Sequence, residues 1–318
     1  MITPFQAMQA AVDILQDSPH PKNKIACTVF NDAYSVSRTN HWPAIIEEKL
    51  GRDIRIGNSS GTIHAETSAL TSAWNDGIPT DGMSLCVSDP FCPNCAKNIA
   101  EAGIKTIYID HKGFKKDFFA RRSDHFENMS MQICEKAGIS VYELWRKDEK
   151  IVPIFMAPED YKAPNDSPIT ADEIDTPDEA TFQNVIAGAS ALHNRRKFTV
   201  AFAQKPEGGT VCLIARAHAV VGFSMQDPQD AVHIENPQGK YSFIQEPVNR
   251  MLMHMVRYGY RLQEGAFYCS QVPTAREQVN LVGAGIKRIT VGDMGRYRGA
   301  NSLAAMELLS QHDILDYS

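Results

Sequence analysis

Two short motifs in the first half of the chain carry side chains that bind metal ions, and a shared ion would force them together in the fold. The motif His-Ala-Glu at positions 64–66 begins a run of apolar residues at helical spacing, and Cys-Pro-Asn-Cys at positions 92–95 opens a short helix after a strand. The stretch 67–91 is long enough for one helix and one strand. The spacing predicts that both motifs lie at the ends of adjacent helices.

The ligand types favour zinc. Zinc takes four tetrahedral ligands, and a catalytic site leaves one position to water. His64, Cys92 and Cys95 supply three, and a helix N-terminus favours the thiolate forms that bind metal. Taken alone, the two cysteines could also form a structural zinc half-site or a redox pair, and His64 could be an ordinary core or surface histidine. The combination of both motifs favours the catalytic zinc site.

Glu66 stands two residues from a predicted ligand and need not bind the metal itself. A carboxylate beside a metal-bound water can take its proton and pass it on. The combination H-x-E … C-x-x-C is the signature of zinc deaminases. By itself Glu66 would be an ordinary solvated helix residue, so its assignment depends on the neighbouring motifs.

The segments HAETSAL and SDPFCPNCAKNIAEAGIKTIYID resemble the cytidine and deoxycytidylate deaminase superfamily, nearest its deoxycytidylate and tRNA-adenosine branches. The resemblance covers most of residues 1–145. It implies that His64, Cys92 and Cys95 are zinc ligands and that Glu66 carries the proton. It also implies substrate contacts at Ala65 and at Asn40, which begins an N-x-x-P loop after the second predicted strand; Asn40 could instead serve only as a turn residue.

One position departs from the family pattern. The family usually has proline directly before the first cysteine, whereas here Phe91 stands between Pro90 and Cys92. We expect metal binding to survive this insertion and the loop that shapes the pocket wall to differ.

The resemblance implies hydrolytic deamination of a cytosine-containing nucleoside or nucleotide (cytidine, deoxycytidine or dCMP), with release of ammonia. One alternative is a deaminase of another aminated base, such as a free base, a guanine or adenine compound, or a tRNA adenosine. Another is a non-catalytic zinc-binding regulatory protein on this fold. The net charge of −6 and the pI of about 5.9 weigh against a polynucleotide partner and favour a small molecule.

The second half of the chain looks like a degenerate copy of the first. At a constant offset of 182 positions, GIKTIYID lies over GIKRITVG, and the order of predicted helices and strands repeats. The chemistry does not repeat. The pairs at this offset are His64 with Glu246, Glu66 with Val248, Cys92 with Thr274 and Cys95 with Glu277. The second copy is therefore expected to be non-catalytic.

These patterns predict an α/β protein of two tandem cytidine-deaminase-like domains, each with three α/β/α layers around a mixed sheet of about five strands. We expect a catalytic domain over 1–150, an acidic, proline-rich linker over 151–180, and the degenerate domain over 181–318. Exposed domain faces favour a homodimer. The chain shows no run of 18 apolar residues and no signal peptide, which predicts a cytoplasmic protein without a membrane span.

Overall fold

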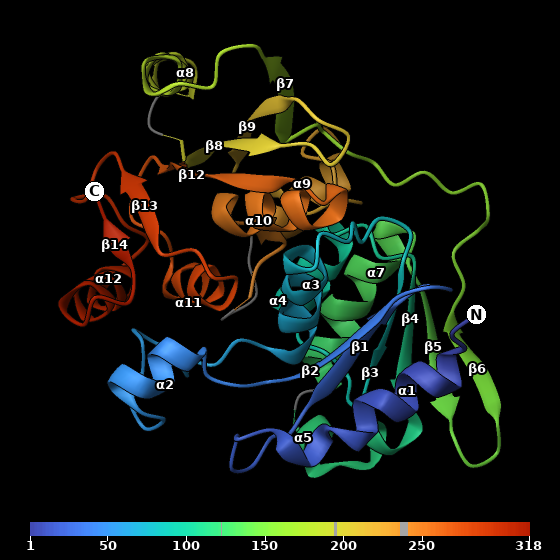
Figure 1. Cartoon of the computed structure of the whole chain (residues 1–318). Helices are drawn as coiled ribbons and strands as arrows, with labels where there is room; N and C mark the ends of the chain where they lie inside the picture. Colours follow the sequence, from blue (N-terminus) through green and yellow to red (C-terminus); the bar gives the residue numbers. More distant parts are fainter. Residues whose placement is uncertain (122, 194–195, 236–240) are drawn as a thin grey trace. The chain divides into compact units, whose positions relative to one another are not determined.

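The computed structural model describes residues 1–121, 123–193, 196–235 and 241–318. It divides into two compact units (Figure 1). The first unit comprises 1–41, 64–166 and 219–245, and the second unit comprises 42–63, 167–218 and 246–318. No helix in the described ranges combines the length and the apolar character that a membrane crossing needs.

The first unit is built on a six-stranded mixed sheet of order β2-β1-β3-β4-β5-β6. Its strands are β1 (Ala26–Phe30), β2 (Ser35–Thr39), β3 (Ser84–Val87), β4 (Thr106–Asp110), β5 (Ser140–Trp145) and β6 (Lys150–Phe155). The neighbours β3, β4 and β5 run parallel, and the remaining pairs are antiparallel. The predicted β-α-β segment thus lies at the centre of the sheet.

Helices cover both faces of this sheet. They are α1 (Pro4–Asp13), α3 (Ala65–Asn75), α4 (Pro93–Glu101) and α7 (Met131–Ala137), with the short helices α5 (Asp117–Ala120) and α6 (Ser123–His125) and helical turns at 15–17, 111–115 and 126–130. Helix α1 begins at a capping box on Thr3 and buries Met8 against Phe30, Cys86 and Leu144. Helices α3, α4 and α7 pack on the other face (Figure 1).

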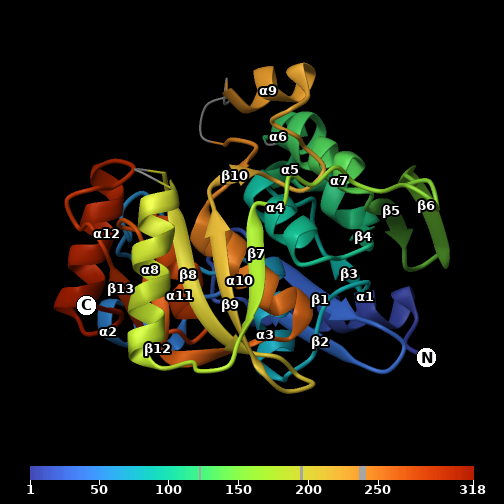
Figure 2. The ribbon, with the colours of Figure 1, turned by 90° about the horizontal axis from the view of Figure 1, so that it is seen from above.

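The second unit repeats this topology. Its sheet has the order β14-β13-β12-β8-β9-β7, in which the first five strands match β5-β4-β3-β1-β2 of the first unit, parallel pairs included. The strands are β7 (Ile169–Ile174), β8 (Phe198–Gln204), β9 (Thr210–Arg216), β12 (Arg261–Cys269), β13 (Arg288–Val291) and β14 (Asp316–Tyr317) (Figure 2). Each sheet has six strands rather than about five, because β6 and β7 add edge strands at opposite ends of the common order.

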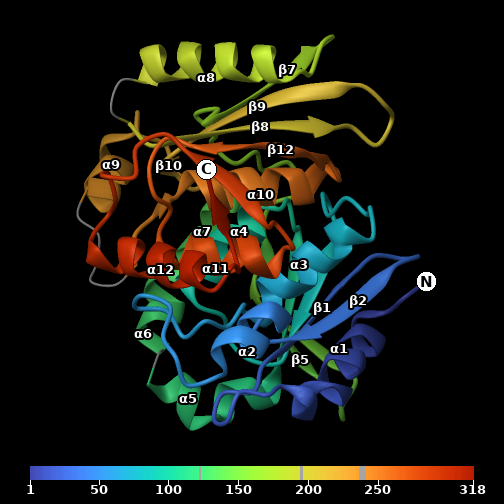
Figure 3. The same ribbon diagram turned by 60° about the vertical axis from the view of Figure 1, so that its left-hand side comes forward.

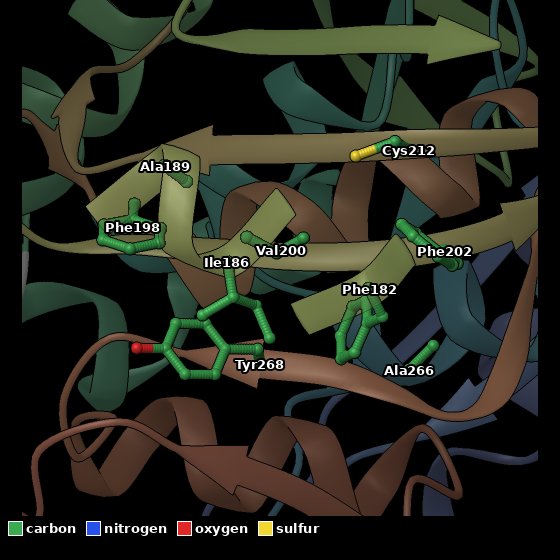
Figure 4. Close-up of a cluster of buried hydrophobic side chains, with 9 residues drawn as sticks. All are labelled: Phe182, Ile186, Ala189, Phe198, Val200, Phe202, Cys212, Ala266 and Tyr268. Carbon is green, nitrogen blue, oxygen red and sulfur yellow. The ribbon is translucent and has the colours of Figure 1, made fainter. Parts of the chain in front are cut away.

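The second unit also has helices on both faces of its sheet, as predicted for three layers. The helices of this unit are α2 (Ala44–Leu50), α8 (Glu179–His193), α10 (Pro247–Tyr258), α11 (Ala275–Gly283) and α12 (Ala300–Gln311). Helix α8 buries Phe182 and Ile186 against Val200 and Phe202 of β8 and Tyr268 of β12 (Figure 4). Helix α10 lies on the opposite face (Figure 3).

The predicted linker over 151–180 contains two strands. Residues up to Phe155 form β6, and Ile169–Ile174 form β7. The stretches 156–168 and 175–178 have no regular secondary structure beyond turns and bends. The acidic, proline-rich composition predicted a linker and gave no sign of these two edge strands. Edge strands tolerate charges and proline better than central strands do, so this composition is compatible with them.

The two halves also exchange segments, which the predicted boundaries at 150 and 181 did not anticipate. Residues 42–63 belong to the second unit, and residues 219–245 belong to the first. At the offset of 182, residues 42–63 correspond to 224–245, so the two exchanged pieces are equivalent parts of the repeat. The segment 219–245 contains α9 (Pro228–Glu235), and β10 (His218–Ala219) and β11 (Ile244–Gln245) pair at its two ends.

Candidate metal centre and active site

The predicted ligands lie at the starts of two packed helices. His64 is the N-cap residue of α3 and Cys92 is the N-cap residue of α4; both have extended backbones, and neither side chain caps its own helix. An N-cap side chain normally accepts a hydrogen bond from the first turn. Because these two side chains make no such bond, their metal-ligating atoms remain available to bind a metal ion.

The three side chains converge. The Sγ atoms of Cys92 and Cys95 are 3.6 Å apart, and His64 Nδ1 lies 3.6 Å from the first and 3.2 Å from the second. A tetrahedral zinc ion with ordinary bond lengths separates such atoms by roughly 3.6–3.8 Å. Two separations match this range and the third is shorter. Among the described residues, these three form the group of His, Cys and acidic side chains able to hold a metal ion.

The pKa values of the two thiols also favour the binding of a cation. The hydrogen bond between the sulfurs lowers the pKa of Cys92 well below its ordinary value, and His64 lowers it further. The same bond, together with burial, raises the pKa of Cys95. The pair therefore releases one proton readily and holds the second, which a cation displaces when the thiolates bind it.

Glu66 lies in the first turn of α3 and is 2% exposed. Its Oε2 atom is buried without a hydrogen-bond partner among the described residues. Burial raises the pKa of its carboxyl above the ordinary value, although the nearby His64 acts in the opposite direction. A buried carboxyl with an unsatisfied oxygen and a raised pKa is suited to exchange protons with a bound ligand.

The two predicted substrate contacts differ in the hydrogen-bonding groups that remain available for a substrate. Ala65 is the first residue of α3, where backbone N–H groups have no intrahelical acceptor. Asn40, in contrast, is buried in a loop network: its Oδ1 accepts from Ser18 Oγ (2.8 Å) and Ile25 N (2.9 Å), and its Nδ2 donates to Asn23 O (2.8 Å). Only one N–H of the Asn40 amide is left for another acceptor.

The same loop carries a residue that the sequence did not single out. His20 is close enough to His64 for a positive charge there to lower its pKa, in addition to the larger effect of burial. Its Nδ1 accepts a hydrogen bond from Asn23 N (3.0 Å). A histidine in a turn-rich stretch between two prolines gives no periodic signal, so only the fold brings it to the metal centre.

The side chain of Phe91 is buried against other aromatic side chains. It is 2% exposed and meets Phe126 edge to face, with ring centroids 5.5 Å apart. Phe126 in turn contacts Phe114 and Phe119, and Ser130 Oγ donates to the Phe91 carbonyl (3.0 Å). The extra residue before Cys92 therefore anchors the loop in a buried aromatic cluster.

The equivalent place in the second unit is held together without a metal. Glu277, at the position of Cys95, accepts from Thr274 N (2.8 Å) through Oε2 and from Val248 N (3.0 Å) through Oε1, so one carboxylate joins the first turns of α11 and α10. Glu246 pairs with Lys197 Nζ (3.1 Å). The adjoining cavity of about 10 Å³ has room for roughly one water and not for a nucleobase.

Residues 2–111 match the family model of the cytidine and deoxycytidylate deaminase zinc-binding region. Over these residues the chain is similar to cytidine and deoxycytidylate deaminases. The family model describes a zinc-binding region, and the matched residues contain both motifs of the site described above, which supports zinc as the metal.

Two curated proteins are similar to part of the chain. The ComE operon protein 2 of Bacillus subtilis (strain 168) is 34% identical over 93 residues, which are 29% of this chain and 43% of that protein. The deoxycytidylate deaminase of Enterobacteria phage T4 is 30% identical over 91 residues, 29% of this chain and 42% of that enzyme. The chain therefore spans less than half the length of these relatives.

A solved deaminase structure overlaps a larger share of the chain. The dCMP deaminase of cyanophage S-TIM5, in complex with dCMP and dUMP, has 22% sequence identity and a TM-score of 0.34. It covers 43% of this chain and 93% of its own.

We expect one zinc ion per chain, bound by the first unit. Cys92→Ser should reduce bound zinc to near zero, because a hydroxyl is a far poorer zinc ligand than a thiolate. Elemental analysis of the purified protein measures both values. If about half of the zinc stayed in Cys92→Ser, a second site would exist.

Proposed function

We propose that the protein is a zinc-dependent hydrolytic deaminase of a cytosine-containing nucleoside or nucleotide, with its active site in the first unit. His64, Cys92 and Cys95 would hold the zinc. The observation that carries the proposal is Glu66, two residues from His64: a buried carboxyl with a raised pKa, whose Oε2 has no hydrogen-bond partner among the described residues. A purely structural zinc site needs no proton carrier, so it gives no reason for such a carboxyl.

When bound, zinc supplies a water nucleophile that is reactive at neutral pH. Glu66 accepts a proton from this water as the carbon–oxygen bond forms at the amino-bearing ring carbon. The carboxyl would give this proton to the ring nitrogen, accept the second water proton from the hydroxyl group now on the carbon, and give that proton to the amino nitrogen, so that the carbon–nitrogen bond breaks and ammonia leaves. The product carries a carbonyl where the substrate carried the amino group, so one water is consumed for each ammonia released.

The start of α3 would orient the ring. The Ala65 N–H points out of the first helical turn, where the positive end of the helix favours an electron-rich acceptor such as a ring carbonyl. The remaining N–H of Asn40 would be a further donor, held in place by Ser18 and Ile25.

The substrate class rests on the relatives rather than on a pocket. The phage T4 relative is named a deoxycytidylate deaminase, which supports a cytosine ring as the substrate. No observation favours a guanine or adenine compound or a non-catalytic role. The cytoplasmic location, the homodimer and the exclusion of nucleic acid stay predictions from the sequence.

Ammonia release by the zinc-loaded full-length protein tests the proposal. The panel contains cytosine, cytidine, deoxycytidine and their monophosphates, with adenine and guanine compounds and tRNA as competitors. We expect turnover on a cytosine nucleoside or nucleotide and none after zinc is removed by a chelator, with recovery on adding zinc back. Turnover of a purine compound alone, or silence across the panel with one zinc bound, would contradict the proposed substrate or the proposed catalysis, respectively.

A further inference from the structure

A segment from the second half of the chain docks on the helix that carries the two cysteines. Residues 219–245 belong to the first unit, and their last two residues, Ile244 and Gln245, form β11. Lys97 Nζ of α4 donates to the Ile244 carbonyl (2.7 Å), and Gln245 Nε2 donates to Asn98 Oδ1 (2.8 Å). The contact thus lies one helical turn beyond Cys95.

The Gln245 contact continues to the helix that carries Glu66. Asn98 Nδ2 donates to Thr67 Oγ1 (3.2 Å), and Thr67 follows Glu66 directly in α3. Gln245, Asn98 and Thr67 are 1%, 3% and 2% exposed. Because water does not reach this chain of three side chains, each polar atom depends on its protein partner.

The Asn98 amide uses both of its ends in this series of hydrogen bonds. Its Oδ1 accepts from Gln245 Nε2, and its Nδ2 donates to Thr67 Oγ1. Without the Gln245 amide, the buried Asn98 Oδ1 loses this partner, and the amide is held less firmly toward Thr67, which weakens the link between α4 and α3.

We propose that Gln245 is a positioning residue for the zinc centre, contributed by the second half of the chain to the first unit. Acting through Asn98 and Thr67, it holds α3 and α4 at the spacing that brings His64 to the two thiols. The inference rests on the metal centre of the proposed function and does not depend on which substrate is deaminated.

The second unit provides an internal comparison. Asn280 and Asn249 stand at the positions equivalent to Asn98 and Thr67, and they keep the helix-to-helix link, with Asn280 Nδ2 donating to Asn249 Oδ1 (2.9 Å). The residue equivalent to Gln245 is Ile63, whose side chain packs closely against Gly283 of α11. At this position the helix pair α10 and α11 has the apolar side chain of Ile63. The pair α3 and α4, which carries the candidate metal ligands, has the polar side chain of Gln245.

The test compares Gln245→Met with Ile63→Met. Both place the same unbranched side chain at equivalent positions, and methionine keeps the approximate volume of glutamine while removing the amide. We expect zinc to pass to a competing chelator roughly three- to tenfold faster from Gln245→Met than from the unmodified protein, which is less than the 10- to 100-fold loss of affinity that follows removal of a group bonded directly to a metal ligand. Ile63→Met should stay within twofold.

Cobalt substitution gives a second readout. The visible absorption of bound Co²⁺ reports ligand geometry, and we expect its bands to change in Gln245→Met and not in Ile63→Met. Thr67→Val, which is nearly isosteric and removes the acceptor of the same chain, should act in the same direction as Gln245→Met. It also provides the test if Gln245→Met does not fold.

The outcomes separate this inference from the proposed function. Zinc release and cobalt spectra that are unchanged in folded Gln245→Met and Thr67→Val would overturn the positioning role. A fast release in these variants from a protein without deaminase activity would support the positioning role and contradict the proposed reaction. An unmodified protein that binds no zinc would overturn both.

Discussion

Glu66→Gln is expected to keep one zinc per chain and to lose turnover by roughly 10²- to 10⁴-fold, the range that a positioned proton carrier contributes. Glutamine has nearly the same size, so the buried site is not disturbed, but an amide can neither accept the proton of the water nor return it to the ring. The measurement is ammonia release under saturating substrate, together with the zinc content of the same preparation.

Glu264→Gln is the matched control. It makes the same chemical change at an exposed position on β12 in the second unit, and it should leave both turnover and zinc content unchanged. A Glu66→Gln protein with full activity would remove the basis of the proposed mechanism. A variant that lost its zinc together with its activity would instead show that Glu66 helps to hold the metal.

Glu277→Ala should destabilise the second unit by roughly 2–4 kcal/mol, which combines a lost helix cap with a buried N–H left without an acceptor. Glu277 is 2% exposed and serves both Thr274 and Val248, so its removal frees donors on two helices at once. Urea unfolding followed by circular dichroism measures the loss. Zinc content should not change, because the carboxylate lies in the unit without metal ligands.

An exposed residue again provides the comparison. Glu264→Ala should change the free energy of unfolding by less than about 0.5 kcal/mol, as surface substitutions usually do. A Glu277→Ala protein as stable as Glu264→Ala would contradict the role of this carboxylate in joining α10 and α11. A large loss of zinc in Glu277→Ala would show instead that the second unit holds metal.

The two units place different side chains at the starts of corresponding helix pairs, α3 and α4 in the first unit and α10 and α11 in the second. In each, two helices begin side by side with the N-terminal groups of their first turns close together. The first unit places His64, Cys92 and Cys95 there and leaves the N-cap side chains free for a metal. The second places Thr274 and Glu277 there, and they form a capping box. This carboxylate satisfies backbone donors of both helices and stands at the position that Cys95 holds in the first unit.

The sequence by itself predicted the candidate ligand set and the local elements. The two motifs predicted the ligand set, and the convergence of His64 with Cys92 and Cys95 follows the predicted placement at two helix starts. The repeat at an offset of 182 predicted that both halves share one topology, and the strand orders agree. These features are readable because capping, periodicity and ligand spacing act over short stretches of chain.

Only the tertiary structure decided which residues complete each unit. Nothing in the composition of residues 42–63 or 219–245 shows that they belong to the unit of the other half, and so Gln245 gave no signal as a neighbour of Asn98. The edge strands inside the predicted linker, the hydrogen bonds that occupy Asn40 and the burial of Phe91 were hidden in the same way. The physical reason is common to all of them: each depends on partners distant in the sequence, and a pattern of neighbours along the chain carries no information about those partners.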